Sequence, residues 1–173
     1  MKQTESRISL IVVTCDRPED CHTLVQQAIM VGVDQVVVVD NCSKIPIHIP
    51  ASQKVIVIRS QIPLPLGAAR NMGIHSSSGE ILAFVDDDVL LSEGWTSAVR
   101  ESITNADVVG GLVEPIYLDR KPSWIIEDAI GRLTGYTNRW FFQPQPMFAR
   151  NPVKMLTRKR EQGTVPGGNM ALR

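Results

Sequence analysis

The sequence predicts an α/β fold: a mostly parallel central sheet with helices on both faces. Near-continuous apolar runs of strand length, typical of strands buried on both faces, lie at residues 8–13, 36–39, 55–58 and 81–85. Helical spacing of apolar residues follows the first of these runs and leads into the last. The order strand, helix, strand, strand, helix, strand is typical of parallel strands joined by helices that pack on the sheet.

The first helix is expected directly after the strand at 8–13. Pro18 fits its first turn, where the missing N–H has no intrahelical partner in any case. Glu19 and Asp20 suit the positive end of the helix dipole. Gly32 follows the last apolar residue of the pattern and predicts the end of the helix.

The rest of the chain is less regular. The expected elements are a helix at 68–77, a helix that Ser92 and Glu93 open and that runs to about Thr104, a strand at 108–113, a helix at 124–133, a loop at 135–152 and a loop that runs into a strand at 163–173. In the strand at 108–113, the paired glycines Gly110 and Gly111 indicate a bulge or a close approach of backbone.

The composition fits a single domain with a proper core, because 43% of the 173 residues are hydrophobic. Lys+Arg and Asp+Glu both number 18, so no general electrostatic case exists for a nucleic-acid partner. We expect neither a signal peptide nor a transmembrane segment, since every apolar run is too short. The expected location is cytoplasmic, with peripheral membrane contact left open. The three cysteines lack metal-ligand spacing, as expected of reduced thiols.

Three adjacent carboxylates, Asp86, Asp87 and Asp88, follow the apolar run at 81–85. Like charges in a row are unfavourable unless water or a cation screens them. If the backbone stays extended, Asp86 and Asp88 face the same way and Asp87 faces the other. Two carboxylates on one side suit Mg²⁺ or Mn²⁺, which completes its shell with water and substrate phosphates. The alternative is a polar turn in which Asp88 caps a following helix.

Two other strand ends carry similar residues, Thr14-Cys15-Asp16-Arg17 and Asp40-Asn41. A carboxylate there can accept from a base N–H or a ribose hydroxyl, although Asp16 and Asp40 also favour simple turn capping. Since the carboxyl ends of parallel strands share one edge, the three acidic ends together favour a nucleotide crevice.

Arg70 lies in a stretch that opens a helix with small residues, beginning at Gly67. Small residues let the backbone approach a ligand closely, and Arg70 could then pair with a diphosphate in a bidentate way. The alternative is a surface arginine with a salt-bridge partner.

Several common motifs are absent from the sequence. There is no Gly-x-Gly-x-x-Gly after the first strand, no Gly-Lys-Ser/Thr loop and no Gly-x-Ser-x-Gly elbow. Their absence argues against dinucleotide dehydrogenases, P-loop enzymes and α/β-hydrolases. The three histidines have no ligand spacing.

Taken together, these stretches resemble the family 2 glycosyltransferases, which are inverting enzymes of the GT-A fold. The similar segments, in order, are 11–17, 38–43, 67–73, the Asp-x-Asp metal motif in 84–88, and 167–173. The resemblance runs through the chain and is weakest from Glu114 to Gly163. It implies nucleotide contacts for Thr14, Asp16, Arg17, Asp40, Asn41, Arg70, Asp86 and Asp87, a Mg²⁺ or Mn²⁺ site at Asp88 and Asp86, and contacts with the donor sugar and acceptor for Gly167, Gly168 and Asn169.

The resemblance also implies a catalytic carboxylate downstream of Gly167-Gly168-Asn169, whereas this sequence ends at Arg173. Glu114, Glu127 and Asp128 are candidate substitutes, but nothing in their context singles one out, and packing or capping is the favoured explanation for each. We therefore expect one GT-A-like domain over 1–173 that is C-terminally incomplete. Its nucleotide-binding half would span about 7–114 and its acceptor side about 115–173.

The implied activity is transfer of a sugar, of the hexosyltransferase type, from a nucleoside diphosphate sugar to an unidentified acceptor hydroxyl. We expect a UDP-sugar as donor and a saccharide, a lipid-linked group or a protein as acceptor. One alternative is a non-catalytic nucleotide-sugar-binding module. The other is a sugar-phosphate nucleotidyltransferase, which should carry a glycine- and lysine-rich first loop that residues 14–18 lack.

Overall fold

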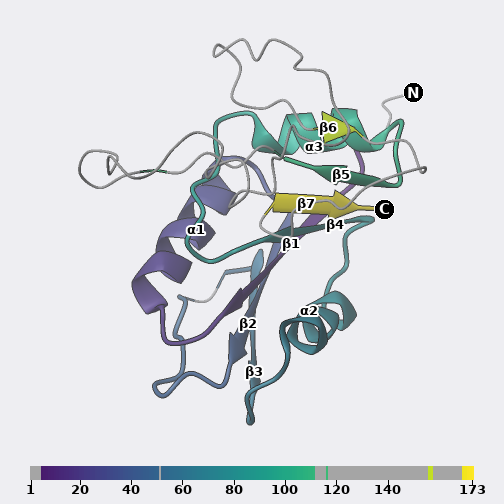
Figure 1. Cartoon of the computed structure of the whole chain (residues 1–173). Helices are drawn as coiled ribbons and strands as arrows, with labels where there is room; N and C mark the ends of the chain where they lie inside the picture. Colours follow the sequence, from purple (N-terminus) through teal and green to yellow (C-terminus); the bar gives the residue numbers. More distant parts are fainter. Residues whose placement is uncertain (1–4, 51, 112–115, 117–155, 158–168) are drawn as a thin grey trace, which may run out of the picture.

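The computed structural model describes residues 5–50, 52–111, 116, 156–157 and 169–173. In this part of the chain, one seven-stranded sheet has the order β3-β2-β1-β4-β7-β5-β6 (Figure 1). The strands are β1 (Ile8–Thr14), β2 (Gln35–Asn41), β3 (Val55–Ser60), β4 (Ile81–Val85), β5 (Val108–Gly110), β6 (Leu156–Thr157) and β7 (Asn169–Leu172). The helices are α1 (Pro18–Met30), α2 (Leu66–His75) and α3 (Trp95–Ile103).

The sheet has a parallel half and an antiparallel half. Strands β3, β2, β1 and β4 pair in parallel, with Thr14 opposite Asp40 and Asp40 opposite Arg59. Strand β7 is antiparallel to both β4 and β5, so β5 runs in the same direction as β4, and β6 is antiparallel to β5. Only β6 and β7 run against the others, which confirms the mostly parallel sheet.

Helices cover both faces of the sheet, as predicted (Figure 1). On one face, α1 and α3 bury apolar residues against alternate strand positions; this core includes Leu10, Val12, Leu24, Val36, Ala83 and Val99. On the other face, α2 packs over the intervening positions; this core consists of Ile11, Val37, Val39, Ala69 and Phe84, and the partly buried Met72 packs against it. The two cores follow from the period of two along buried strands, which sends successive side chains to opposite faces.

Helix α2 packs directly on β1 and β2 because Gly73 faces them without a side chain. A Cβ atom at this position would overlap with the side chain of Ile11 and lie 3.2 Å from Cγ2 of Val39. This close packing fixes the start of α2, and with it Arg70, at the carboxyl end of the sheet.

The first predicted helix is confirmed. It begins at Pro18, carries Glu19 and Asp20 in its first turn, and is followed by Gly32 with φ +83°. The strand expected within 163–173 is also confirmed, as β7.

The helix expected to open at Ser92 and Glu93 begins instead at Trp95. Gly94 adopts φ +78°, and the N–H of Trp95 donates to the carbonyl of Ser92 (3.2 Å), so a turn precedes the helix. The predictions for 112–113, 124–133, 135–152 and 163–168 lie outside the described residues. None of the helices in the described part of the chain has the length and hydropathy that a membrane crossing needs.

Candidate functional site

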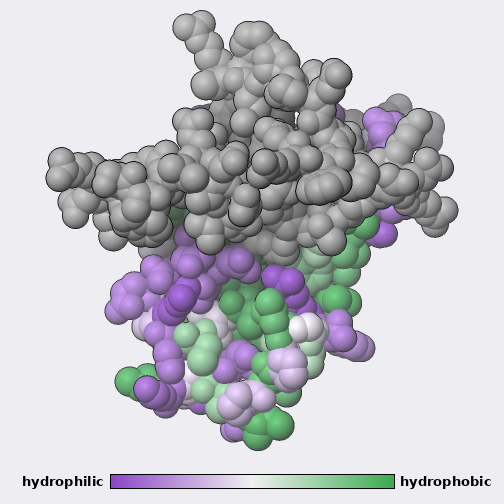
Figure 2. Space-filling view, in the orientation of Figure 1, coloured by the Kyte–Doolittle hydropathy of each residue, from purple (hydrophilic) through white to green (hydrophobic). Residues whose placement is uncertain are grey.

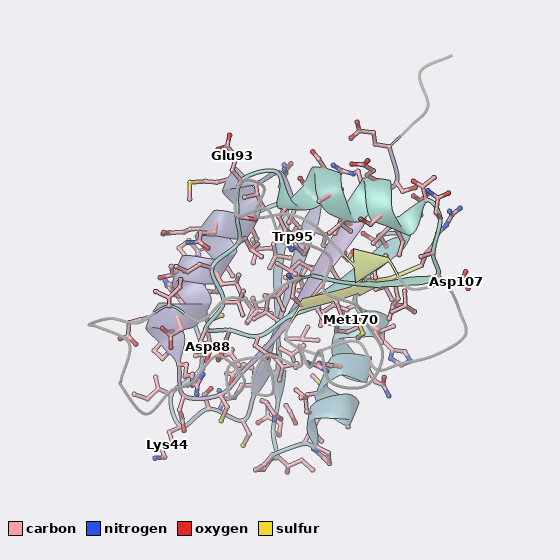
Figure 3. All side chains as sticks on the ribbon, turned by 45° about the horizontal axis from the view of Figure 1, so that its top comes forward. Lys44, Asp88, Glu93, Trp95, Asp107 and Met170 are labelled. Carbon is pink, nitrogen blue, oxygen red and sulfur yellow. The ribbon has the colours of Figure 1, made fainter. Side chains whose placement is uncertain are left out.

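Polar residues meet at the carboxyl ends of β1, β2 and β4. Strand β1 lies between β2 and β4, so the three ends are neighbours at one edge of the sheet. Figure 3 shows Lys44, after β2, and Asp88, after β4, on one side of the molecule, and Asp107, before β5, on the opposite side. Figure 2 shows mixed hydrophilic and hydrophobic surface around the end where β2 and β3 finish. The polar residues of this edge therefore lie next to a surface of mixed character.

The three carboxylates Asp86, Asp87 and Asp88 form a turn, called here the acidic turn. The N–H of Val89 donates to the carbonyl of Asp86 (3.2 Å), so the backbone does not stay extended. The condition that would have placed Asp86 and Asp88 on one side is therefore not met. Asp88 does not cap the next described helix, because α3 begins at Trp95, after Gly94.

Two arginines from opposite faces of the sheet pair with the acidic turn. Nη1 of Arg17, at the start of α1, donates to Asp87 (3.2 Å) and to Asp88 (2.9 Å). Nη2 of Arg70, on α2, donates to Asp86 (3.4 Å), and its guanidinium carbon lies 5.7 Å from the centre of the Phe84 ring. These contacts reduce the repulsion between adjacent carboxylates.

The carboxylates of the acidic turn differ in their exposure. The side chain of Asp87 is mostly buried, whereas Asp86 is 49% exposed and Asp88 57% exposed. Burial raises the pKa of Asp86, Arg70 opposes this effect, and the neighbouring Asp88 and Asp87 add to it. Asp86 and Asp88 thus present hard oxygen donors to solvent, which fits an ion such as Mg²⁺ or Mn²⁺ that takes its other ligands from water and phosphate. Within the described residues, no three of His, Cys, Asp and Glu are grouped as a complete metal site.

The Asp40 turn, which contains Asp40, Ser43 and Ile47, has a different environment. Asp40 is 1% exposed and accepts from the N–H of Ser43 (2.9 Å) and the N–H of Ile47 (3.1 Å). Nη1 of Arg59 donates to the same carboxylate, and Nη2 donates to the carbonyl of Ser43 (2.6 Å). Burial alone would raise the pKa of Asp40, but the hydrogen bonds from Ser43, Ile47 and Arg59 lower it. Asp40 therefore has the capping role; its direct contact with a nucleotide stays a prediction.

Arg59 was not identified from the sequence. It directly follows the apolar run at 55–58, and a cation directly after an apolar strand would have been a usable signal. Its pairing with Asp40 depends on the register of β2 and β3, in which the two residues are opposite each other.

Asn41 and Asp16 tie neighbouring loops together. The side-chain amide of Asn41 donates to the carbonyl of Leu64 (3.0 Å) and accepts from its N–H (2.9 Å). Asp16, with φ +56°, accepts from the N–H of Lys44 (2.7 Å), and its own N–H donates to Oγ of Ser43 (2.9 Å). Within the described residues, the hydroxyl of Thr14 is buried without a hydrogen-bond partner. A buried polar atom of this kind calls for a ligand or a water molecule.

Asn169 lies beside the acidic turn, at the start of β7. It is opposite Val85, the residue before Asp86. Nε1 of Trp95 donates to Oδ1 of Asn169 (3.2 Å), and the N–H of Gly111 donates to its carbonyl (2.9 Å). A Cβ atom on Gly111 would lie 2.6 Å from Cγ of Asn169, which confirms the close approach predicted from the paired glycines. The contact with Trp95 was not predicted, because it joins α3 to a strand that is distant in the sequence.

The remaining candidate residues lie outside the described part of the chain. They are Gly167 and Gly168 of the predicted sugar segment, and Glu114, Glu127 and Asp128 as candidate bases.

Comparison with known proteins places this site in context. The sequence profile of Glycosyl transferase family 2 matches residues 9–163. Glycosyltransferase AglE of Haloferax volcanii is 48% identical over 52 residues, which cover 29% of this chain and 17% of AglE.

Solved structures with a similar fold include S. aureus TarS 1-349, with a TM-score of 0.52 and 20% identity over 68% of this chain and 38% of that one. The same TarS fragment in complex with UDP-GlcNAc has a TM-score of 0.51 and 22% identity, over 68% of this chain and 37% of that one. Mannosyltransferase PcManGT from Pyrobaculum calidifontis, in complex with GDP-Man and Mn²⁺, has a TM-score of 0.53 and 16% identity, over 65% of this chain and 36% of that one.

The chain spans less than two fifths of these structures and about a sixth of AglE. At these identities the solved structures establish the fold, and the profile match over most of the chain establishes the family. The chain belongs to glycosyl transferase family 2 and has the GT-A fold.

Proposed function

We propose that this chain is the donor-binding part of a glycosyltransferase. The proposed reaction is transfer of a sugar, with inversion, from a nucleoside diphosphate sugar to an acceptor hydroxyl in the presence of Mg²⁺ or Mn²⁺. One observation carries the proposal: three carboxylates and two arginines from different elements meet at the carboxyl edge of a GT-A sheet. This mixture of charges is complementary to a divalent ion bound to a diphosphate.

Asp88 and Asp86 are the proposed metal ligands. They are the exposed carboxylates of the acidic turn, and Mg²⁺ or Mn²⁺ commonly binds one or two carboxylates together with phosphate oxygens. When bound, the ion would neutralise charge on the departing nucleoside diphosphate. Asp86 would also contact the ribose or sugar, and Asp87, held by Arg17, would support the turn next to the nucleotide.

The nucleotide contacts are proposed at the neighbouring strand ends. Arg70 is positioned over Phe84 and beside Asp86, where its guanidinium can pair with the diphosphate or the base. Thr14 offers a buried hydroxyl that has no partner among the described residues. Asp16, Asp40 and Asn41 hold the loops that flank this hydroxyl, and we retain them as residues that border the base and ribose.

Gly167, Gly168 and Asn169 are the proposed border of the donor sugar and acceptor. Asn169 supports this assignment, because it is fixed by Trp95 directly beside the acidic turn. The acceptor hydroxyl needs a carboxylate base within hydrogen-bond reach, and no single residue of this chain is assigned that role. We further propose a cytoplasmic location.

The donor is proposed to be a UDP-sugar. Among the similar structures, TarS is bound to UDP-GlcNAc and PcManGT to GDP-Man with Mn²⁺. Thermal shift with UDP and GDP, each with and without Mn²⁺, distinguishes the two bases. We expect stabilisation by UDP that depends on Mn²⁺, of about 2.7 kcal/mol at a ligand concentration of ~100 Kd.

Asp88→Asn should abolish the Mn²⁺-dependent part of this stabilisation. Asp20→Asn removes the same charge from an exposed position on α1 and serves as the matched control. Absence of any nucleotide-dependent shift in the wild-type chain would contradict the proposal. A transfer assay with the chain then tests the remaining alternatives. Binding without transfer is expected both of a donor-binding part and of a nucleotide-sugar-binding module, sugar transfer excludes the module, and release of pyrophosphate supports a nucleotidyltransferase.

A further inference from the structure

Arg17 already places a positive charge in the acidic turn. A single nitrogen, Nη1, donates to Oδ1 of Asp87 (3.2 Å) and to Oδ2 of Asp88 (2.9 Å). Arg17 comes from the start of α1, on the opposite face of the sheet from Arg70. The guanidinium of Arg17 therefore neutralises the same carboxylate, Asp88, that the proposed function assigns to the metal.

The contact between Arg17 and Asp88 is exchangeable. The side chain of Arg17 is 52% exposed and that of Asp88 57% exposed. Ion pairs this exposed contribute little to stability, because water screens the charges and two long side chains lose freedom. Arg17 can thus leave Asp88 whenever another anion offers a comparable partner.

Arg70 is less suited to such an exchange. Although its contact with Asp86 is longer, at 3.4 Å, its side chain is mostly buried and packs over the ring of Phe84, which holds it in place. The arrangement gives the acidic turn one fixed cation, Arg70, and one exchangeable cation, Arg17.

We propose that Arg17 is an internal counter-cation that competes with the divalent ion for Asp88 and thereby couples metal binding to binding of the diphosphate. This inference rests on the proposed function and adds a form of regulation to the same site. Without nucleotide, Arg17 and the ion repel each other, since both carry positive charge within a few ångströms of one carboxylate. With nucleotide, the diphosphate offers Arg17 an alternative anionic partner in a geometry that its planar fork can match.

The coupling must be reciprocal. If the diphosphate raises the affinity for the ion by some factor, the ion raises the affinity for the diphosphate by the same factor. Removal of Arg17 should therefore reduce both the effect of the diphosphate on ion affinity and the effect of the ion on diphosphate affinity. Loss of a contact that Arg17 makes equally well with and without the ion would leave this factor unchanged.

The test measures binding of free Mn²⁺ to the full chain by electron paramagnetic resonance, first alone and then with saturating UDP. For Arg17→Gln we expect Mn²⁺ alone to bind about tenfold more tightly than to wild type, because a nearby positive charge is removed. The factor by which UDP raises the affinity for Mn²⁺ should be about tenfold smaller in this variant than in wild type. Arg17→Lys keeps the positive charge, so its affinity for Mn²⁺ alone should stay within about threefold of that of wild type.

Arg7→Gln is the matched control. Arg7 is exposed and precedes the other end of β1, so the variant has the same net charge as Arg17→Gln without altering the acidic turn. Its Mn²⁺ affinity should equal that of wild type. Thermal unfolding of each variant checks that the fold is retained.

Two results would overturn the inference, and they are distinguishable from failure of the proposed function. If wild type binds Mn²⁺ and UDP but Arg17→Gln binds Mn²⁺ within twofold of wild type, or more weakly, Arg17 is not a competitor and the proposed function stands. If wild type binds neither Mn²⁺ nor UDP, the proposed function fails and the inference fails with it.

Discussion

The Asp40 turn and the acidic turn have equivalent places in the sheet but differ in burial and in hydrogen bonding. Each follows a buried apolar strand in the parallel half of the sheet and lies at the same edge. Asp40 is 1% exposed and accepts from two backbone N–H groups and Arg59, and these partners lower its pKa. Asp86 is 49% exposed, lies beside two other carboxylates, and has a raised pKa.

The difference teaches how the charges of this edge are used. The charge of Asp40 is stabilised by the fold and in return holds the loop that contains Ser43 and Ile47. The charges of the acidic turn oppose one another and remain open to solvent, so an external cation can stabilise them further. The carboxylate at the end of β2 therefore stabilises the fold, whereas the exposed carboxylates at the end of β4 are available to bind a cation. The expected effects below run from the largest to the smallest.

Asp40→Asn should have the largest effect. The variant leaves the mostly buried Arg59 without its anionic partner and replaces an acceptor of two N–H groups by an amide. Loss of one member of a buried ion pair costs about 3 kcal/mol. Chemical denaturation should show this loss, and Asp20→Asn, at an exposed site in the first turn of α1, should lower the free energy of unfolding by less than about 1 kcal/mol. A loss as small as that of the control would mean that Asp40 is not a structural carboxylate.

Arg59→Gln should have the second largest effect. Asp40 would keep its hydrogen bonds from Ser43 and Ile47, so we expect a smaller loss, of about 2 kcal/mol. Arg7→Gln removes an equal charge from an exposed position and is the control in the same denaturation experiment. If Arg59→Gln lowered the free energy of unfolding more than Asp40→Asn did, Arg59 and not Asp40 would be the main stabilising member of this pair.

The sequence was sufficient for most of the parallel half of the fold. Its strands are continuous apolar runs, and its first helix has both a proline start and a glycine stop. These local signals agree with the buried environment of β1, β2 and β4, which is why they were reliable there. For residues 55–58 the prediction of a strand buried on both faces was wrong, because β3 is at the edge of the sheet and Ile56 and Val57 are each 38% exposed. The mostly parallel sheet with helices on both faces then follows from the order of strands and helices, whereas the strand order was not predicted.

The site was predictable in its location but not in its contacts. Sequence reasoning placed Asp40 and the acidic turn at one edge, and it left open whether Asp40 caps a turn or binds a ligand. That choice depends on Arg59, which is opposite Asp40 only in the register of the folded sheet. Likewise, the turn at Asp86 and the contact of Trp95 with Asn169 depend on packing between segments that are distant in the sequence.

The pH dependence of stability gives a third and smaller expected effect. Because folding lowers the pKa of Asp40, its ionised form stabilises the protein at pH values above the unfolded pKa of about 3.9. This contribution is lost as the pH falls through the folded pKa. The difference in unfolding free energy between wild type and Asp40→Asn should therefore be largest near pH 7 and shrink in acid. A difference that grew in acid would have the wrong sign for a carboxylate stabilised by the fold.

Asp86→Asn should have the smallest effect and the opposite sign. Because folding raises the pKa of Asp86, the native state binds its proton more tightly than the unfolded state, and ionisation above about pH 3.9 opposes folding. Nearly half of the side chain is in water, which screens the effect, so the variant should gain less than about 0.5 kcal/mol at neutral pH. The gain should vanish in acid, where wild type is protonated in both states, and denaturation at several pH values measures it. A loss of stability at neutral pH would mean that pairing with Arg70 outweighs desolvation. Asp86 would then belong with Asp40 among the carboxylates that stabilise the fold, and the two strand ends would no longer differ in kind.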